Sequence, residues 1–393
     1  MPTDPAVSAT VPGLPSPALP TAATAAARAS PLDGLPALVP ALPAPGRRVT
    51  MLPLAGSADA LALAQLADAT AGQQRMLVIV CADSLAAQRL VEEITAFAPQ
   101  RRLAFFPDWE TLPYDPISPH QDLVSERLAT LYRLSRGECD VITVTASTAL
   151  QRLPPLSYLA GRTFFLKQGT RLDVDAMRAQ LAVAGYTHVT QVVSPGEFSV
   201  RGGLIDLFPM GSALPYRLDL FGDEIETIRT FDVDTQRTLY PVPDVRLLPA
   251  PEFPLDEAGR TRFRGRFREV FEGDPSRSPL YKDVSNGIVP GGLEYYLPLF
   301  FDATATFLDY LPQDPLVVLH GDVAGALDRF WQDTESRYRL LRGDKARPLL
   351  PPSELFVPPD DFRGALKPFA RIDLPVAGAD AALTQGEQAG RST

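Results

Sequence analysis

The chain has 393 residues, of which 45% are hydrophobic, and a formal net charge of -10 at pH 7. That length accommodates two or three domains with a substantial core, so the fold needs no disulfide framework. An acidic balance excludes general affinity for nucleic acid, because such binding depends on clustered Lys and Arg that neutralise phosphates. Any role on DNA is therefore expected to run through protein partners.

The two cysteines, Cys81 and Cys139, lie inside apolar runs, which is the setting of buried thiols in a reducing compartment. No apolar run approaches the roughly 20 residues that span a bilayer. The N-terminus also lacks the basic and apolar segments of a signal peptide. These features predict a cytoplasmic protein with no membrane partner.

The first 45 residues are dense in Pro and Ala and show no periodicity, which predicts a disordered arm outside the fold. From residue 46 to 162 the pattern alternates apolar strands with amphipathic helices, as in an α/β domain whose parallel sheet is covered by helices. Strands are expected at 76–82, 103–106 and 141–146, and a helix at 122–134. A further helix, opened by Ser84, carries four apolar residues: Leu85, Leu90, Ile94 and Phe97.

Short strands replace this pattern at residues 163–247, which we interpret as a small α+β insert. A helix at 174–184 precedes these strands and ends at Gly185. Gly202 and Gly203 indicate a bulge or a close approach of backbones, because glycine inside a strand pattern is typical of both. Residues 221–224 are expected to form a hairpin turn.

Helical and apolar segments return at residues 248–360, with a strand at 316–320 and a helix at 323–341. This return indicates that the chain re-enters the first α/β domain, which is therefore split in sequence. Residues 361–393 end in small and polar residues without a closing element. We interpret them as a linker toward further domains.

The strand expected around residues 216–221 has two different faces, because successive side chains alternate between them. The apolar face builds the core with Tyr216, Leu218 and Leu220. The other face and the neighbouring strand carry four residues that the core does not need: Arg201, Arg217, Asp219 and Phe221. An aromatic ring beside arginines favours a protein-binding surface that tolerates truncation of each side chain, whereas a lone exposed Phe on a monomer is the ordinary alternative.

The candidate for a nucleotide-binding loop is the stretch LAGSADALALAQL. Such a loop needs glycines that bring backbone amides to the phosphates, then Lys and Ser or Thr that reach the phosphates and magnesium. Gly56 and Ser57 are present, but Asp59 and Ala60 stand where Lys and Ser or Thr are needed. We therefore expect no cofactor in this chain, and an active helicase-like ATPase that also binds DNA is the alternative hypothesis.

Other chemistry has little support in the sequence. His120, His188 and His320 are far apart and have no metal-ligand neighbour at the usual spacing, so each is interpreted as structural or solvated. His120 lies in SPHQD without a nucleophile signature and is not favoured as a catalytic base. The acidic residues between 223 and 234 lack the ligand spacing of an EF-hand and fit turns and a solvated strand face. The sequence thus predicts neither a metal site nor a catalytic residue.

Two long segments carry a specific resemblance to the amino-terminal region of the bacterial transcription-repair coupling factors. They are DWETLPYDPISPHQDLVSERLATLY, at 108–132, and RGGLIDLFPMGSALPYRLDLFGDEIETIRTFDVDTQRTL, at 201–239. The similarity extends from about residue 50 to about residue 358 and includes GLEYYLPLFF and RPLLPP. A match of this length sets chance similarity aside.

The resemblance implies a module similar to the excinuclease subunit UvrB. Such a module has a degenerate helicase-like, P-loop-type domain split in sequence, and an insert that docks on UvrA. The positions that match the family's UvrA-contacting motif are Arg201, Arg217 and Phe221. The residues at Asp59 and Ala60 agree with a module that has lost its ATPase activity.

The resemblance also implies what the full-length family protein does. That protein is similar to an ATP-dependent DNA translocase, which displaces RNA polymerase stalled at DNA damage and recruits UvrA for nucleotide excision repair. Its ATP- and Mg-dependent motor, its contacts with double-stranded DNA and its RNA polymerase-binding domain would lie downstream. A carboxy-terminal domain would cover the UvrA surface until RNA polymerase is engaged. The present chain is therefore expected to be an adaptor rather than an enzyme.

Overall fold

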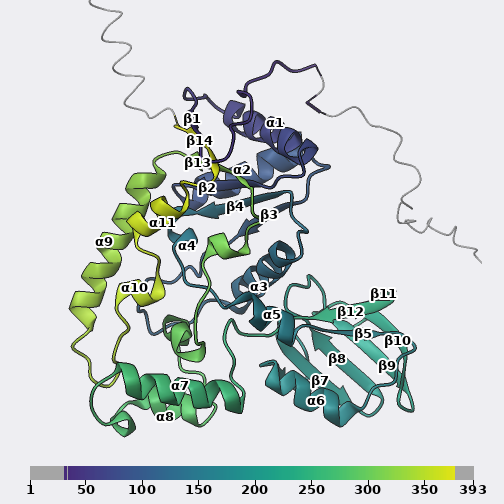
Figure 1. Cartoon of the computed structure of the whole chain (residues 1–393). Coiled ribbons are helices and arrows are strands. Elements are labelled where there is room, and N and C mark those ends of the chain that lie inside the picture. The colour runs from purple at the N-terminus through teal and green to yellow at the C-terminus, as the bar shows by residue number, and fades with distance from the viewer. Residues whose placement is uncertain (1–30, 33, 377–393) are drawn as a thin grey trace, which may run out of the picture. The chain divides into compact units, whose positions relative to one another are not determined.

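The computed structural model in Figure 1 describes residues 31–32 and 34–376. The chain divides into two units after Leu35, and every helix and strand given below lies in the second. Most of the predicted disordered arm lies outside the described residues. The prediction that the arm takes no part in the fold is wrong from Pro36 onward, because Gln65 donates to the Pro36 carbonyl and accepts from Leu38 N, both at 2.9 Å.

A six-stranded sheet with the strand order β1-β14-β13-β2-β4-β3 forms the first part of the fold. All its neighbouring strands are parallel, which confirms the predicted fold class. β2 and β4 are buried at every position, and this explains their unbroken apolar runs LVIVC and VITVT. The strands are β1 (Arg48–Thr50), β2 (Leu77–Cys81), β3 (Leu103–Phe106), β4 (Val141–Thr145), β13 (Leu316–His320) and β14 (Ala370–Leu374).

Strand β14 corrects the interpretation of residues 361–393 as a linker. It lies between β1 and β13, with Arg371 opposite Arg48 and Ala370 opposite Leu316. Figure 1 shows the purple β1 and the yellow β14 side by side, although they come from opposite ends of the chain. The strand was missed because Arg371 and Asp373 interrupt its three buried apolar residues. The split α/β domain therefore extends at least to Leu374.

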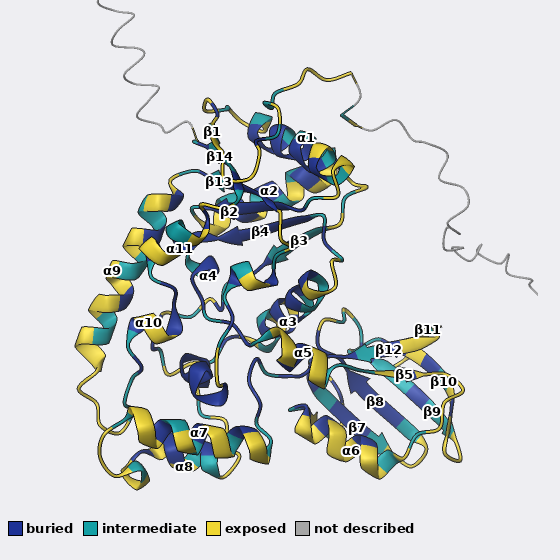
Figure 2. Cartoon of the chain, viewed as in Figure 1, coloured by how far each residue is buried: buried dark blue, intermediate teal, exposed yellow. Residues whose placement is uncertain are grey.

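Helices cover the parallel sheet, and further helices form the segment of chain between β12 and β13. Figure 2 shows the strands largely in the buried colour and α7 and α9 with yellow, exposed sides. The α-helices are α1 (Ala58–Gly72), α2 (Ser84–Phe97), α3 (Gln121–Ser135), α4 (Ala146–Ala149), α5 (Leu156–Arg162), α7 (Glu257–Val270), α8 (Pro279–Ser285), α9 (Val323–Leu341), α10 (Pro352–Leu355) and α11 (Pro359–Ala365). The 3-10 helices are η1 (Pro275–Arg277), η2 (Leu293–Phe300) and η3 (Phe307–Tyr310).

Helix α2 shows how local sequence fixes an element and where that reasoning fails. The side chain of Asp83 caps it by accepting from Ala86 N, and Leu90 and Ile94 are buried. Leu85 was expected on the same face but is 78% exposed. It precedes Leu90 by five residues, which at 3.6 residues per turn places it about 140° away around the helix.

The insert has a second six-stranded sheet, with the order β11-β10-β9-β8-β7-β6. Its neighbouring strands are antiparallel, except that β6 runs parallel to β7. β5 pairs with β12, so the chain enters and leaves the insert side by side. The elements are β5 (Phe164–Lys167), α6 (Val174–Val183), β6 (Thr187–His188), β7 (Glu197–Arg201), β8 (Leu204–Phe208), β9 (Tyr216–Phe221), β10 (Glu224–Phe231), β11 (Thr238–Pro241) and β12 (Asp244–Leu247).

Two glycine-containing turns set the register of this sheet. Gly222 has a φ of +64° and lies in the hairpin turn between β9 and β10, as predicted. Gly202, with a φ of +61°, and Gly203 form the turn between β7 and β8 rather than a bulge. A Cβ on Gly203 would lie 3.2 Å from the Leu220 carbonyl oxygen, so the predicted close approach of backbones is present.

The apolar face of the insert sheet packs into a continuous core. Leu218 is fully buried, and Tyr216 and Leu220 pack against the same core, as the alternation predicted. Met177 and Leu181 of α6 belong to this core as well. None of the helices in the described part of the chain is long and apolar enough to cross a membrane.

Candidate partner-binding site

The polar face of the insert sheet holds the four predicted site residues. Arg201 ends β7, and Arg217, Asp219 and Phe221 follow one another along one side of β9. Strand β8 lies between β7 and β9, so Arg201 and Arg217 approach each other across it. The residue opposite Arg217 on this middle strand is Asp206. The register thus gathers both arginines around one carboxylate.

Asp206 is 2% exposed and joins the two arginines. Arg217 donates from Nε to Oδ1 at 2.7 Å and from Nη2 to Oδ2 at 2.9 Å, which is the bidentate arrangement of a strong ion pair. Arg201 donates from Nη2 to Oδ2 at 2.5 Å. The prediction missed Asp206, although a charged residue inside the apolar run LIDLF is a recognisable signal.

Arg217 is not the solvent-facing residue that the alternation predicted, since its side chain is only 16% exposed. Its Nη1 also donates to the Gln236 carbonyl at 3.0 Å, and its guanidinium carbon lies 4.7 Å from the centroid of the Phe231 ring. Hydrogen bonding to Asp206 raises the pKa of Arg217. The fold was expected to tolerate truncation of Arg217 because its side chain would face solvent. That premise is wrong, since the side chain is mostly buried and supports the sheet.

The other three residues remain available to a partner. The side chain of Arg201 is 54% exposed, and Phe221 is 79% exposed at the end of β9. Asp219 accepts a hydrogen bond from Thr227 Oγ1 at 2.9 Å, which fixes its carboxylate on the same face. An exposed ring that shares a sheet face with a guanidinium and a carboxylate is suited to protein recognition.

The predicted nucleotide loop occupies the connection between β1 and α1. Gly56 and Ser57 are exposed, whereas Asp59 is 4% exposed and Ala60 is fully buried in the first turn of α1. The chain thus keeps the strand-loop-helix order of a phosphate-binding loop but not its side chains. Asp59 instead pairs with Arg89 at 2.6 Å and with His320 Nε2 at 2.9 Å.

The two other histidines lie on different elements, and the two cysteines are buried in the fold. His120 caps α3, where its Nδ1 accepts from Asp122 N, and His188 is exposed beside the Phe198 ring. Both cysteines are free and buried, and burial raises the pKa of Cys81 to about 12. Within residues 31–32 and 34–376, no group of three or more His, Cys, Asp or Glu could hold a metal ion.

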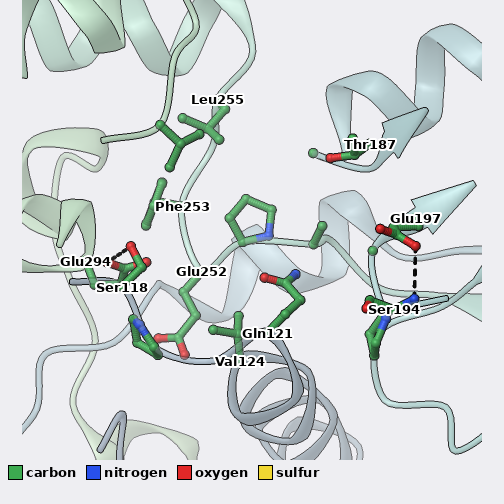
Figure 3. A pocket seen from close by; sticks show the side chains of 17 residues that line it. Ser118, Gln121, Val124, Thr187, Ser194, Glu197, Glu252, Phe253, Leu255 and Glu294 are labelled. Atoms are coloured by element: carbon green, nitrogen blue, oxygen red, sulfur yellow. Dashed lines mark hydrogen bonds between the residues drawn. The ribbon is translucent and has the colours of Figure 1, made fainter. Parts of the chain in front are cut away.

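A cavity of about 380 Å³ lies where residues of the insert approach α3 and η2 (Figure 3). Glu294 on its wall accepts a hydrogen bond from Ser118 Oγ at 2.9 Å, and burial raises the pKa of Glu294 to about 7. Glu197 lies on the opposite wall and accepts from Ser194 N. Sequence reasoning did not find this cavity, because its lining comes from segments far apart in the chain.

A family comparison defines the class of the insert. Residues 164–253 match the family model of the UvrB interaction domain. This range runs from β5 to beyond β12 and therefore includes the whole polar face described above. The insert is therefore similar to the UvrB interaction domain.

Known proteins are similar to this chain over a longer range than the insert alone. It is 45% identical over 322 residues to the transcription-repair-coupling factor of Escherichia coli, which covers 82% of this chain and 28% of that protein. The transcription-repair-coupling factor of Haemophilus influenzae is 43% identical over 347 residues, covering 84% and 30%, and that of Myxococcus xanthus is 32% identical over 365 residues, covering 87% and 29%. The chain belongs with the transcription-repair-coupling factors, and the predicted resemblance is confirmed. It spans less than a third of their length.

Proposed function

We propose that this chain is an adaptor module that binds UvrA through the polar face of its insert sheet. In a longer transcription-repair coupling protein, this contact would recruit UvrA to RNA polymerase stalled at DNA damage. Further domains would supply the ATP-driven translocase that displaces the polymerase. The observation that carries the proposal is the coincidence of a match to the UvrB interaction domain with an exposed Phe221 on the same sheet face as the half-exposed Arg201.

The geometry gives each residue on this face a different part in recognition. Phe221 supplies the apolar anchor, because most of its ring is open to solvent. Arg201 binds Asp206 through one nitrogen and remains more than half exposed, so its guanidinium can bind a carboxylate or carbonyl on UvrA. Asp206 holds that guanidinium in place, and Arg217 in turn fixes the carboxylate of Asp206. The contact requires no cofactor and breaks no covalent bond.

Binding to purified UvrA tests this proposal, with the wild-type chain compared with Phe221→Ala. Truncating an anchor costs on the order of 2 kcal/mol, so we expect Kd to rise about thirtyfold. The matched control is Phe165→Ala, since Phe165 is also exposed, at 54%, but lies on β5 in the small sheet. Equal Kd values for wild type and Phe221→Ala would refute this face as the site.

A further inference from the structure

The carboxylate of Asp59, in the first turn of helix α1, is surrounded by groups that bind anions. Arg89 donates from Nη1 to Oδ1 at 3.1 Å and from Nη2 to Oδ2 at 2.6 Å. His320 Nε2 lies 2.9 Å from Oδ2, and the backbone N–H of Ala60 lies 2.7 Å from Oδ1. A guanidinium fork, a ring nitrogen and a helix-terminal amide thus converge on one negative group.

Electrostatics show that this carboxylate is ionised. Burial alone would raise the pKa of Asp59, but hydrogen bonds from His320, Arg89 and Ala60 together lower it far below its usual range. An ionised carboxylate only accepts hydrogen bonds, so His320 Nε2 must carry the proton it donates. The Nδ1 atom of His320 is buried and has no hydrogen-bond partner within the described residues. Within the described residues, Asp59 is therefore the hydrogen-bond partner that orients this ring.

The ligand set is assembled from three elements that meet at the carboxyl end of strand β13. Asp59 opens α1, Arg89 lies in α2, and His320 is the last residue of β13, where it is 1% exposed. The side chain of Arg89 is 36% exposed, so the group borders solvent on one side. Guanidinium forks and helix-terminal amides are also the groups that bind phosphate in proteins.

We propose that Asp59 is a built-in occupant of an oxyanion site, which its carboxylate fills in the place of a phosphate group. Arg89, His320 and the Ala60 amide are the site's ligands, and the wild-type chain is closed to phosphate because these donors are already engaged. Removing the carboxylate exposes the same donors to solvent. The vacated site then takes a free tetrahedral oxyanion such as phosphate.

Thermal unfolding of the full chain in rising inorganic phosphate, at constant ionic strength set with sodium chloride, tests this site. The wild-type Tm stays constant, whereas the Tm of Asp59→Ala rises by several degrees and saturates. The double variant Asp59→Ala with Arg89→Gln loses that response. Asp68→Ala is the matched control, because Asp68 lies on the same helix and pairs with Arg101 at 2.6 Å.

Refolding keeps the test decisive if Asp59→Ala is unstable. In that case the variant is refolded with and without phosphate, and recovery of the folded chain only with phosphate supports the site. An Asp59→Ala variant that shows no effect of phosphate on Tm or on recovery overturns the proposal. A wild-type or Asp68→Ala response of the same size also overturns it. Because UvrA takes no part, failure here is separate from failure of the adaptor function.

Discussion

The same ionic arrangement occurs beside each of the two six-stranded sheets, but it has a different role in each place. In each, a carboxylate that is at least 95% buried binds two side chains from neighbouring elements: Asp59 binds Arg89 and His320, and Asp206 binds Arg201 and Arg217. In the parallel sheet both faces are covered and His320 is 1% exposed, so the group meets solvent only on the side of Arg89, whose side chain is 36% exposed. In the insert sheet one face is open, and Arg201 remains 54% exposed.

The difference lies in how much hydrogen-bonding capacity the outer arginine retains. Arg89 gives its fork to Asp59 and also pairs with Glu93 at 2.8 Å, so three of its five N–H donors are engaged within the chain. Arg201 uses Nη2 for Asp206, and its side chain is more than half exposed on the same sheet face as Phe221. A buried carboxylate thus fills a site when its arginine partner gives it a bidentate fork, and it positions a binding residue when that partner commits a single nitrogen to it.

A third carboxylate, that of Glu252, is the least exposed of the three, so removing it should cause the largest loss of stability. Arg127 and Glu252 are both almost fully buried, with an Nε–Oε1 distance of 2.5 Å, and Trp109 Nε1 also donates to Glu252. Removing one member leaves a charge uncompensated in the core, so Glu252→Ala should lower the free energy of unfolding by about 3–5 kcal/mol. Urea unfolding measures the change.

The control for this pair is Arg102→Ala. Arg102 pairs with Asp140, but its side chain is 54% exposed, so we expect a loss below about 1 kcal/mol. Losses of equal size in Glu252→Ala and Arg102→Ala would show that burial does not decide the strength of these pairs.

Glu294 differs from these carboxylates because its hydrogen-bond donor is Ser118 and not an arginine fork. The free-energy cost of burying its charge is therefore less well offset. Burial raises its pKa from 4.5 to about 7, so the folded chain holds a proton that the unfolded chain has released between those pH values. Stability should therefore fall as pH rises through this window. By pH 8 the cost reaches about 3 kcal/mol, and Glu294→Gln should remove it.

Unfolding of wild type and Glu294→Gln at pH 5 and pH 8 checks this expectation. The variant should be more stable than wild type at pH 8 and differ little at pH 5. Glu226→Gln, at an exposed position of β10, controls for the loss of one charge. A constant difference between Glu294→Gln and wild type at both pH values would contradict the assignment.

These ionic groups also show what local sequence patterns cannot predict, namely contacts between residues far apart in the chain. Apolar runs and helical periodicity predicted the strand at 316–320 and the helix at 323–341 with the bounds that β13 and α9 have. The family resemblance and the two faces of β9 pointed to the polar surface of the insert. Local periodicity could not place His320 against Asp59, because the two residues are 261 positions apart.

Strand register is the second source of error. The alternation in β9 correctly put Arg217 on the polar face, but only the pairing with β8 reveals that Asp206 lies opposite it and draws its side chain inward. The same limit explains β14, which depends on β1 and β13 for its place in the sheet. Elements follow from local pattern, whereas the chemistry at their meeting points follows from long-range register.

The smallest expected difference separates the two arginines of the insert. Arg217→Ala leaves the buried Asp206 with Arg201 as its remaining ion-pair partner and should cost about 2 kcal/mol of stability. Arg201→Ala removes a half-exposed partner while the bidentate Arg217 contact persists, so its cost should stay below about 1 kcal/mol. Urea unfolding of both variants gives the comparison. If Arg201→Ala proves the more destabilising, then Arg201 supports the sheet and Arg217 becomes the better candidate for direct contact with UvrA.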